Sequence, residues 1–155
     1  MRRVFLTMIV AVLAATQASA QNPLNIDKVF EGDLAKSKNA IEILVTGERA
    51  NRIELTTYHS LAVENEPSAA AIIERAVAAD GTKALDKEVE YRGNHIYFGF
   101  YSLPTIKVND KPMCRYIMYL NQNLASKKPT DKVTLVYIES HRDAHYVKSL
   151  IAKNK

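Results

Sequence analysis

The pattern of apolar and polar positions is clearest in the stretch Lys87–Leu103, where aromatic and β-branched residues flank the pair Gly93-Asn94. Such a pair between such flanks is typical of a two-residue β-hairpin turn. Residues directly opposite across a hairpin share a face of the sheet. A turn at this pair therefore predicts one face with Val89, Tyr91, Ile96, Phe98 and Phe100, and another with Glu88, Glu90, Arg92, His95, Tyr97 and Tyr101.

Alternation of apolar and polar residues with a period of two predicts further strands. The last of them is apolar on both sides, which indicates a central position covered on two faces. The segment Gly47–Asn51 is expected to join the first two strands of the chain as a hairpin. The expected ranges of these strands are Ala40–Thr46, Arg52–Val63, Met113–Gln122 and Lys132–Glu139.

Apolar residues at helical spacing predict three helices. The second has Pro67 in its first turn and Gly81 directly after its end, as helices commonly do. The third begins with Ser140 and Asp143, which have the spacing of a capping box. The helices are expected within Gln21–Lys38 (capped by Asn25), over Asn65–Asp80 and over about His141–Lys153, and the loops over Pro104–Pro112 and Asn121–Asp131.

The expected order of elements is α-β-β-α-β-β-β-β-α. Helices are too few in this order for a doubly wound parallel sheet, and hairpin connections favour antiparallel pairing. We therefore predict an α+β fold, with a mostly antiparallel sheet of about six strands and the helices packed on one face.

The first twenty residues have the pattern of a secretory signal peptide. Arg2 and Arg3 precede the apolar run Val4–Ala15, and Ala18-Ser19-Ala20 is a typical cleavage site. The run is shorter than the roughly 20 residues that a membrane-spanning helix needs. We therefore expect residues 1–20 to be removed, residues 21–155 to form one domain with no membrane span, and the product to be periplasmic or secreted.

Charge and cysteine content narrow the classes of function. The formal net charge is +4, and cleavage would remove two of the arginines. Basic residues are spread singly, with no run longer than Lys127-Lys128, so no nucleic-acid partner is expected. Cys114 is the only cysteine, which excludes an intramolecular disulfide. Its expected inward position argues against a thiol nucleophile.

His141 and His145 are a candidate pair of metal ligands, because side chains four residues apart share one face of a helix. However, Arg142 stands where the helix of a zinc protease has its glutamate. The spacing fixes no third ligand. We therefore expect no metal or other cofactor, and a metal-dependent hydrolase that uses this pair is the alternative hypothesis.

The outward face of the sheet is the main candidate for binding. In the strand Met113–Gln122, alternation is expected to place Tyr116, Met118 and Leu120 inward and Arg115, Ile117 and Tyr119 outward. Tyrosine and arginine are enriched at recognition surfaces, although aromatic residues are also good strand formers. The expected binding residues are Arg92, His95, Tyr97, Tyr101, Arg115 and Tyr119.

Beside the signal peptide, three segments carry a resemblance: NIDKVFE (Asn25–Glu31), IELTTYHSL (Ile53–Leu61) and VTLVYIES (Val133–Ser140). With them the chain resembles small exported bacterial proteins of unknown function from gut anaerobes. The resemblance implies a compartment and a fold, and no reaction. Our leading hypothesis is a non-catalytic binding or interaction module of the cell envelope, whose partner is an envelope protein or another envelope component.

Overall fold

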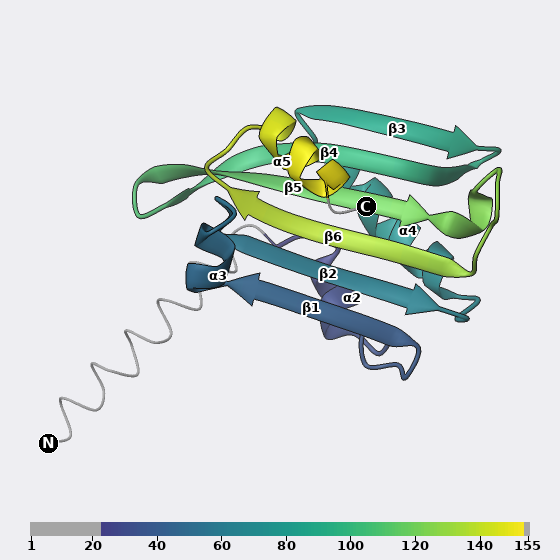
Figure 1. The fold of residues 1–155 in the computed structure, drawn as a ribbon. Coiled ribbons are helices and arrows are strands. Elements are labelled where there is room, and N and C mark those ends of the chain that lie inside the picture. The colour runs from purple at the N-terminus through teal and green to yellow at the C-terminus, as the bar shows by residue number, and fades with distance from the viewer. Residues whose placement is uncertain (1–22, 154–155) are drawn as a thin grey trace, which may run out of the picture.

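A six-stranded antiparallel sheet organises the computed structural model, which describes residues 23–153 (Figure 1). Its strand order is β1-β2-β6-β5-β4-β3. The expected signal peptide lies outside the described residues. The elements are α2 (Asp27–Glu31), β1 (Ala40–Thr46), α3 (Gly47–Asn51), β2 (Thr57–Glu64), α4 (Ala69–Gly81), β3 (Asp86–Arg92), β4 (His95–Val108), β5 (Lys111–Asn121), the 3-10 helix η1 (Gln122–Leu124), β6 (Lys132–Ser140) and α5 (Ala144–Lys153).

The α+β class and the antiparallel sheet are confirmed, and the order of elements closely matches the predicted one. Two expected connections differ from the prediction. Gly47–Asn51 is the helix α3, and β2 begins only at Thr57. The expected loop Pro104–Pro112 belongs mostly to the β4–β5 hairpin, which turns at Asn109-Asp110. Both turn residues have positive φ (51° and 61°), as a type I′ turn requires.

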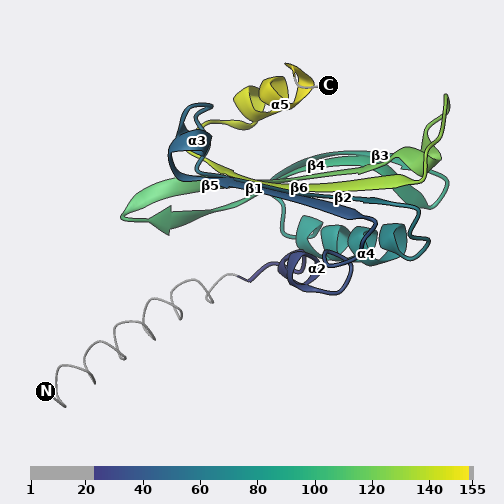
Figure 2. The same cartoon turned by 60° about the horizontal axis from the view of Figure 1, so that its bottom comes forward.

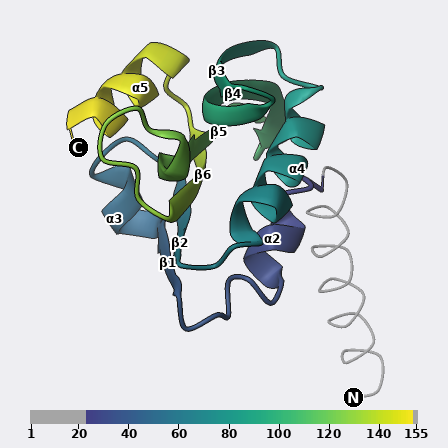
Figure 3. The ribbon, with the colours of Figure 1, turned by 90° about the vertical axis from the view of Figure 1, so that its right-hand side faces the viewer.

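Helices cover both faces of the sheet, as Figures 2 and 3 show. We call the face under α2 and α4 the α4 face, and the face under α3 and α5 the α5 face. This arrangement differs from the predicted packing of all helices on one face. The reason is that β6 is apolar on both sides: Val133 and Leu135 are buried on the α4 face, and Val136 and Ile138 on the α5 face. Each apolar surface needs its own cover.

The core consists of two hydrophobic clusters, one on each face of the sheet. The larger cluster joins α2 and α4 to the sheet, for example through Ile26, Ile73, Val77, Leu61 and Ile117. The smaller cluster, under α5, is formed by Ala50, Leu55, Phe100, Tyr116, Val136, Ile138 and Val147. The ammonium group of Lys148 on α5 contacts Glu88 on β3 and lies 5.1 Å from the ring centroid of Phe100. These contacts hold α5 over the β3–β4 side of the sheet.

The central hairpin has the predicted turn but a different register. Tyr91 pairs with Ile96 as predicted, whereas Glu90 pairs with Phe98 instead of Tyr97. A β-bulge at this point adds one residue to β4, so that the side-chain alternation shifts beyond it. Phe98 and Phe100 consequently lie on the α5 face, whereas Ile96, which was predicted to share their face, lies with Tyr101 on the α4 face.

Buried tyrosines should make the fold sensitive to high pH. Burial raises the pKa of Tyr101 to about 12 and also raises the pKa of Tyr119 and of Tyr137. A raised pKa in the folded state means that each neutral tyrosine stabilises the fold below its unfolded pKa of about 10. That contribution is lost as the pH rises through the folded pKa. We therefore expect the free energy of unfolding to fall steeply between about pH 10 and 12.

Urea unfolding followed by far-UV circular dichroism from neutral pH to about pH 12 measures this fall. The variant Tyr119→Phe serves as the control. It has one ionisable group fewer, and the Tyr119 hydroxyl is buried without a hydrogen-bond partner among the described residues. Its stability should therefore depend less steeply on pH. A wild-type stability that stays unchanged up to about pH 12 would contradict the prediction.

Candidate functional site

Three of the six predicted binding residues lie inside the fold. Tyr101, Arg115 and Tyr119 are only 2, 6 and 0% exposed, and they point to the α4 face. The prediction that they project outward is therefore wrong. Alternation in the sequence correctly placed Tyr101 and Phe100 on opposite faces of the sheet, and likewise Tyr119 and Met118. However, α4 and α2 cover the face that was expected to be open.

The other three predicted residues lie near the tip of the β3–β4 hairpin. The guanidinium of Arg92 lies 4.7 Å from the ring centroid of Tyr97, and its Nη2 lies 2.6 Å from Oε1 of Glu90. His95 Nδ1 lies 3.4 Å from Oε2 of Glu74 on α4. These side chains are half-buried or exposed, and their charged groups contact each other or the adjoining helix. A role of Arg92, His95 and Tyr97 in binding a partner stays a prediction.

The two histidines near the C-terminus are not on one helical turn. The helix α5 begins at Ala144, so that His141 lies before it, and Nδ1 of His141 is 3.0 Å from the carbonyl oxygen of Pro112. Asp143, rather than Ser140, accepts the hydrogen bond from the N–H of Tyr146 in the first turn. Within residues 23–153 no group of three or more His, Cys, Asp or Glu side chains is arranged to hold a metal ion.

A buried carboxylate joins α4 to the start of α2. Asp80 is 3% exposed, and it accepts hydrogen bonds from the backbone N–H of Asn25 (2.8 Å), the side-chain amide of Asn25 (2.8 Å) and the backbone N–H of Ile26 (3.0 Å). These donors belong to the N-terminus of α2, where the N-cap residue Ile26 makes no capping bond of its own. Asn25 was predicted to be the cap, but it is a donor to Asp80.

Next to Asp80 lies a small cavity of about 240 Å³ with a mixed lining, formed by Pro23, Leu24, Asp80, Lys83, Leu103, Pro104 and Arg115. Two nitrogens of Arg115, Nε and Nη2, donate to the carbonyl oxygen of Pro104 (3.2 and 3.0 Å). Burial raises the pKa of nearby Asp27. The carboxylate of Asp80 and the guanidinium of Arg115 are both hydrogen-bonded within the chain, which indicates a structural role for them.

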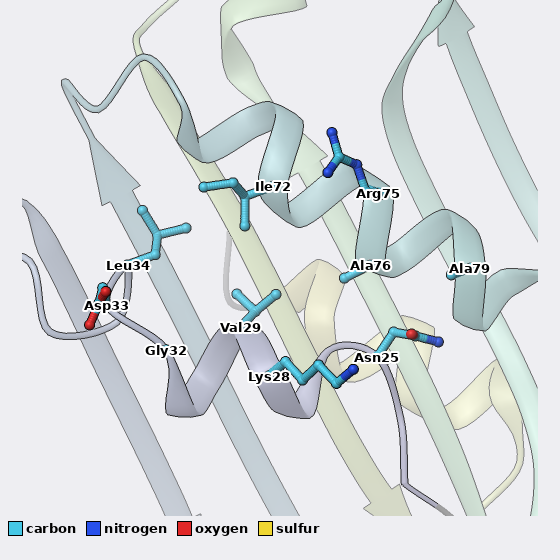
Figure 4. Close-up of a pocket in the computed structure, with 10 residues that line it drawn as sticks. All are labelled: Asn25, Lys28, Val29, Gly32, Asp33, Leu34, Ile72, Arg75, Ala76 and Ala79. Atoms are coloured by element: carbon cyan, nitrogen blue, oxygen red, sulfur yellow. The ribbon is translucent and has the colours of Figure 1, made fainter.

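A second hollow of about 620 Å³ lies between α2 and α4 (Figure 4). Figure 4 shows Val29 directed from α2 toward α4, with Ala76 beyond it and Ile72 close to Leu34. Lys28 also lines the hollow. The hollow runs along the contact between the two helices that cover the α4 face. The small side chain of Ala76 allows these helices to approach closely.

The third hollow is an apolar groove of about 510 Å³ on the α5 face, which we call the α5 groove. Residues of β1, β2, β5, β6 and α5 line it, together with Ile53 after α3. Its volume falls within the range of about 300–1,000 Å³ that is usual for small-molecule sites. The lining residues are Val45, Ile53, Tyr58, Met118, Leu120, Thr134, Val136, Ile138, Leu150 and Ile151.

The α5 groove exists because the cover of the α5 face is incomplete. The helix α5 has only ten residues, and α3 has five and lies at one end of β1 and β2 (Figure 2). Most of the groove residues are consequently only half-buried, although they are apolar and lie over central strands. None of them was among the predicted binding residues. The apolar residues on both sides of β6 were the signal in the sequence that both faces of the sheet need to be covered.

The fold and its hollows define an α+β domain with a six-stranded antiparallel sheet, helices on both faces and an apolar groove beside α5. The chain belongs to a family described as "Family of unknown function (DUF6108)", whose model matches residues 13–151. Neither the curated proteins nor the solved structures contain a match to the chain. In the part of the chain that the structure describes, no helix is both long and apolar enough to cross a membrane.

Proposed function

We propose that this protein is an exported, non-catalytic binding module of the cell envelope, which takes an acyl chain or a similarly apolar group in the α5 groove. The carrying observation is a groove of about 510 Å³ whose lining is almost entirely apolar. Moving apolar surface out of water contributes about 25 cal/mol per Å². A ligand that fills the groove would cover side chains that α5 leaves half-exposed. The export and the envelope location rest on the N-terminal sequence pattern.

The polar groups of the α5 groove limit the ligand class further. The hydroxyl groups of Tyr58 and Thr134 are the polar side-chain groups among its lining residues, and no charged side chain of residues 23–153 lines it. An uncompensated charge in such surroundings is costly. This composition supports a ligand with an apolar body and at most a hydroxyl or carbonyl group in the groove. Because none of the described residues that line it carries a carboxylate, imidazole or thiol, its chemistry favours binding over catalysis.

The alternative, a metal-dependent hydrolase, has no comparable support. His141 bonds to a backbone carbonyl group, and His145 is exposed on α5. The spacing of these two residues in the sequence was its only basis. Measuring the zinc content of the purified protein tests this alternative directly.

A titration with a fluorescent fatty acid tests the proposed function. We expect saturable binding by the wild-type protein and binding at least about tenfold weaker by Leu120→Glu, because the added carboxylate would lose water inside the groove. The matched control is Leu85→Glu, which makes the same substitution at a leucine that is 73% exposed outside the groove. Circular dichroism would verify that both variants are folded. No binding by the wild-type protein, or equal binding by both variants, would contradict the proposal.

A further inference from the structure

The two edges of the sheet differ in how they are protected against pairing with another strand. The edge strand β3 (DKEVEYR) alternates charges along its length, which discourages pairing. The other edge strand, β1 (AIEILVT), has a single charged residue, Glu42. Its side chains of Ile41, Ile43 and Leu44 are 67, 49 and 61% exposed. An exposed apolar edge strand is a ready template for a further strand.

The free hydrogen-bonding groups of β1 can be identified from its pairing with β2. The carbonyl oxygen of Asn39, directly before β1, accepts from the N–H of Glu64 at 3.0 Å, and these two residues are opposite each other in the register. Bonded and non-bonded pairs alternate along an antiparallel pair. The odd-numbered residues of β1 therefore bond to β2. The N–H and C=O groups that point away from the sheet belong to Ala40, Glu42, Leu44 and Thr46. Of these, the N–H of Ala40 already donates to the carbonyl oxygen of Ser37 at 3.1 Å, so the donors left for a partner strand are those of Glu42, Leu44 and Thr46.

We propose that a second copy of this chain pairs with β1, strand against antiparallel strand, around a two-fold axis at Ile43. In this arrangement Ile43 meets Ile43 of the second copy, Ile41 faces Val45, and Glu42 faces Leu44. The even-numbered residues then face each other. The N–H and C=O groups of Glu42 meet those of Leu44, and the N–H of Thr46 meets the carbonyl oxygen of Ala40, whose own N–H donates to Ser37. The two sheets become one continuous sheet, and the exposed apolar side chains of β1 on the α5 face form one strip.

Charge and length select this register over its neighbours. An axis at Glu42 would place two carboxylates directly opposite each other, which is destabilising. An axis at Leu44 would leave residues of β1 unpaired at its start. Ile43 is the middle of the seven-residue strand, so an axis there pairs all seven residues. Glu42 already lies 2.6 Å from Nε2 of His59 within its own chain, and facing Leu44 it meets no like charge.

A second copy fits β1 because the edge is complementary to itself. Two-fold dimers are the commonest soluble oligomers, and their interface uses the same surface on both subunits. Self-pairing satisfies the outward N–H groups of Glu42, Leu44 and Thr46, covers Ile41 and Ile43, and separates the two carboxylates. Dimer formation does not depend on a ligand in the α5 groove, so either proposal can fail without the other.

Sedimentation equilibrium of protein expressed from the full coding sequence tests the dimer. We expect a concentration-dependent dimer and at least a tenfold weaker association for Ile43→Lys, because two ammonium groups would meet at the axis. Leu44→Pro should weaken association similarly, since it removes an N–H that points away from β2. The control Ile72→Lys changes an isoleucine of similar exposure (44%) on α4 and should leave the dimer intact. A monomer at all concentrations, or a dimer unaffected by Ile43→Lys, overturns the proposal.

Disulfide formation tests the register of the proposed strand pairing. This test remains informative even if the Leu44→Pro variant does not fold. In a Cys114→Ser background, Ile43→Cys should cross-link two copies under mild oxidation. The reason is that a non-hydrogen-bonded antiparallel pair has its Cα atoms about 4.5 Å apart, within disulfide reach. Ile41→Cys alone should cross-link poorly because it faces Val45, whereas Ile41→Cys combined with Val45→Cys should cross-link well. Equal cross-linking of the two single variants, or none by Ile43→Cys, overturns the proposed axis.

Discussion

Replacing Tyr101 with alanine should lower the free energy of unfolding by roughly 3–5 kcal/mol, a loss typical of a large side chain removed from a core. Tyr101 is 2% exposed and belongs to the larger hydrophobic cluster between the sheet and α4. The control is Tyr91→Ala, which removes a tyrosine that is 60% exposed on the neighbouring strand β3. It should cost less than about 1 kcal/mol. Urea unfolding of the three proteins measures both values, and equal losses would contradict the burial of Tyr101.

Two glycines make room for the Tyr101 ring, and they allow a sharper test of its packing. A methyl group on Gly81 would lie 2.6 Å from Cε1 of Tyr101, and one on Gly99 would lie 2.6 Å from Cε2. Gly81→Ala should therefore destabilise the wild-type protein by roughly 1–3 kcal/mol through overpacking. Gly81 is the last residue of α4, where alanine would otherwise be favourable.

In the Tyr101→Ala background the effect of Gly81→Ala should change sign. The clash is then gone, and the higher helix propensity of alanine should stabilise the protein by up to about 1 kcal/mol. A double-mutant cycle of these two positions measures the coupling directly. If Gly81→Ala costs the same in both backgrounds, the ring of Tyr101 does not occupy the space between the two glycines.

The sequence predicts the strands well because their patterns are local. The range Ala40–Thr46 is predicted without error, since apolar alternation runs through it and a glycine follows directly. The turn at Gly93-Asn94 is also predicted correctly. The bulge after this turn is not predicted. Both Tyr97 and Phe98 are aromatic, so the sequence pattern fits a pairing of Glu90 with either residue. The glycine at 99, over which the Tyr101 ring lies, was the residue that could have indicated it.

The candidate site was harder to predict than the strands, because it depends on which helix covers which face. Alternation places Tyr119 and Met118 on opposite faces of the sheet. It does not indicate that α4 covers the face of Tyr119, or that the α5 groove lies on the face of Met118. The pattern of β6, with Val133 and Leu135 on one side and Val136 on the other, required cover on both faces. Applied to the whole sheet, this requirement excludes an open tyrosine face, and it leaves the incompletely covered α5 face as the place for a binding groove.

Contacts between distant parts of the chain have no local signal at all, and Asp80 is the clearest case. It lies 55 residues from Asn25 in the sequence, yet it accepts three hydrogen bonds from Asn25 and Ile26. At the end of a predicted helix, an aspartate is ordinarily a solvated residue. In the structure it is the group that caps α2.

Replacing Asp80 with alanine should therefore cost roughly 2–4 kcal/mol, because it leaves buried donors of α2 without an acceptor. Asp80→Asn should cost less than Asp80→Ala, because the amide oxygen of asparagine can still accept a hydrogen bond. Some cost remains, because the NH₂ group of asparagine would face an N–H donor. The control Asp33→Ala removes an exposed aspartate near the other end of α2 and should change stability by less than about 0.5 kcal/mol. Urea unfolding measures these values, and an Asp80→Ala protein as stable as Asp33→Ala would contradict the capping role.

Hydrogen exchange at the Ile26 amide shows where the stability is lost. If Asp80 mainly holds α2 in place, this amide should exchange much faster in Asp80→Ala than in the wild-type protein, while the amides of the central strands β5 and β6 stay protected. If exchange rises equally at Ile26 and in the central strands, α2 and the sheet unfold together. In that case Asp80 supports the whole α4 face and not only the helix that it caps.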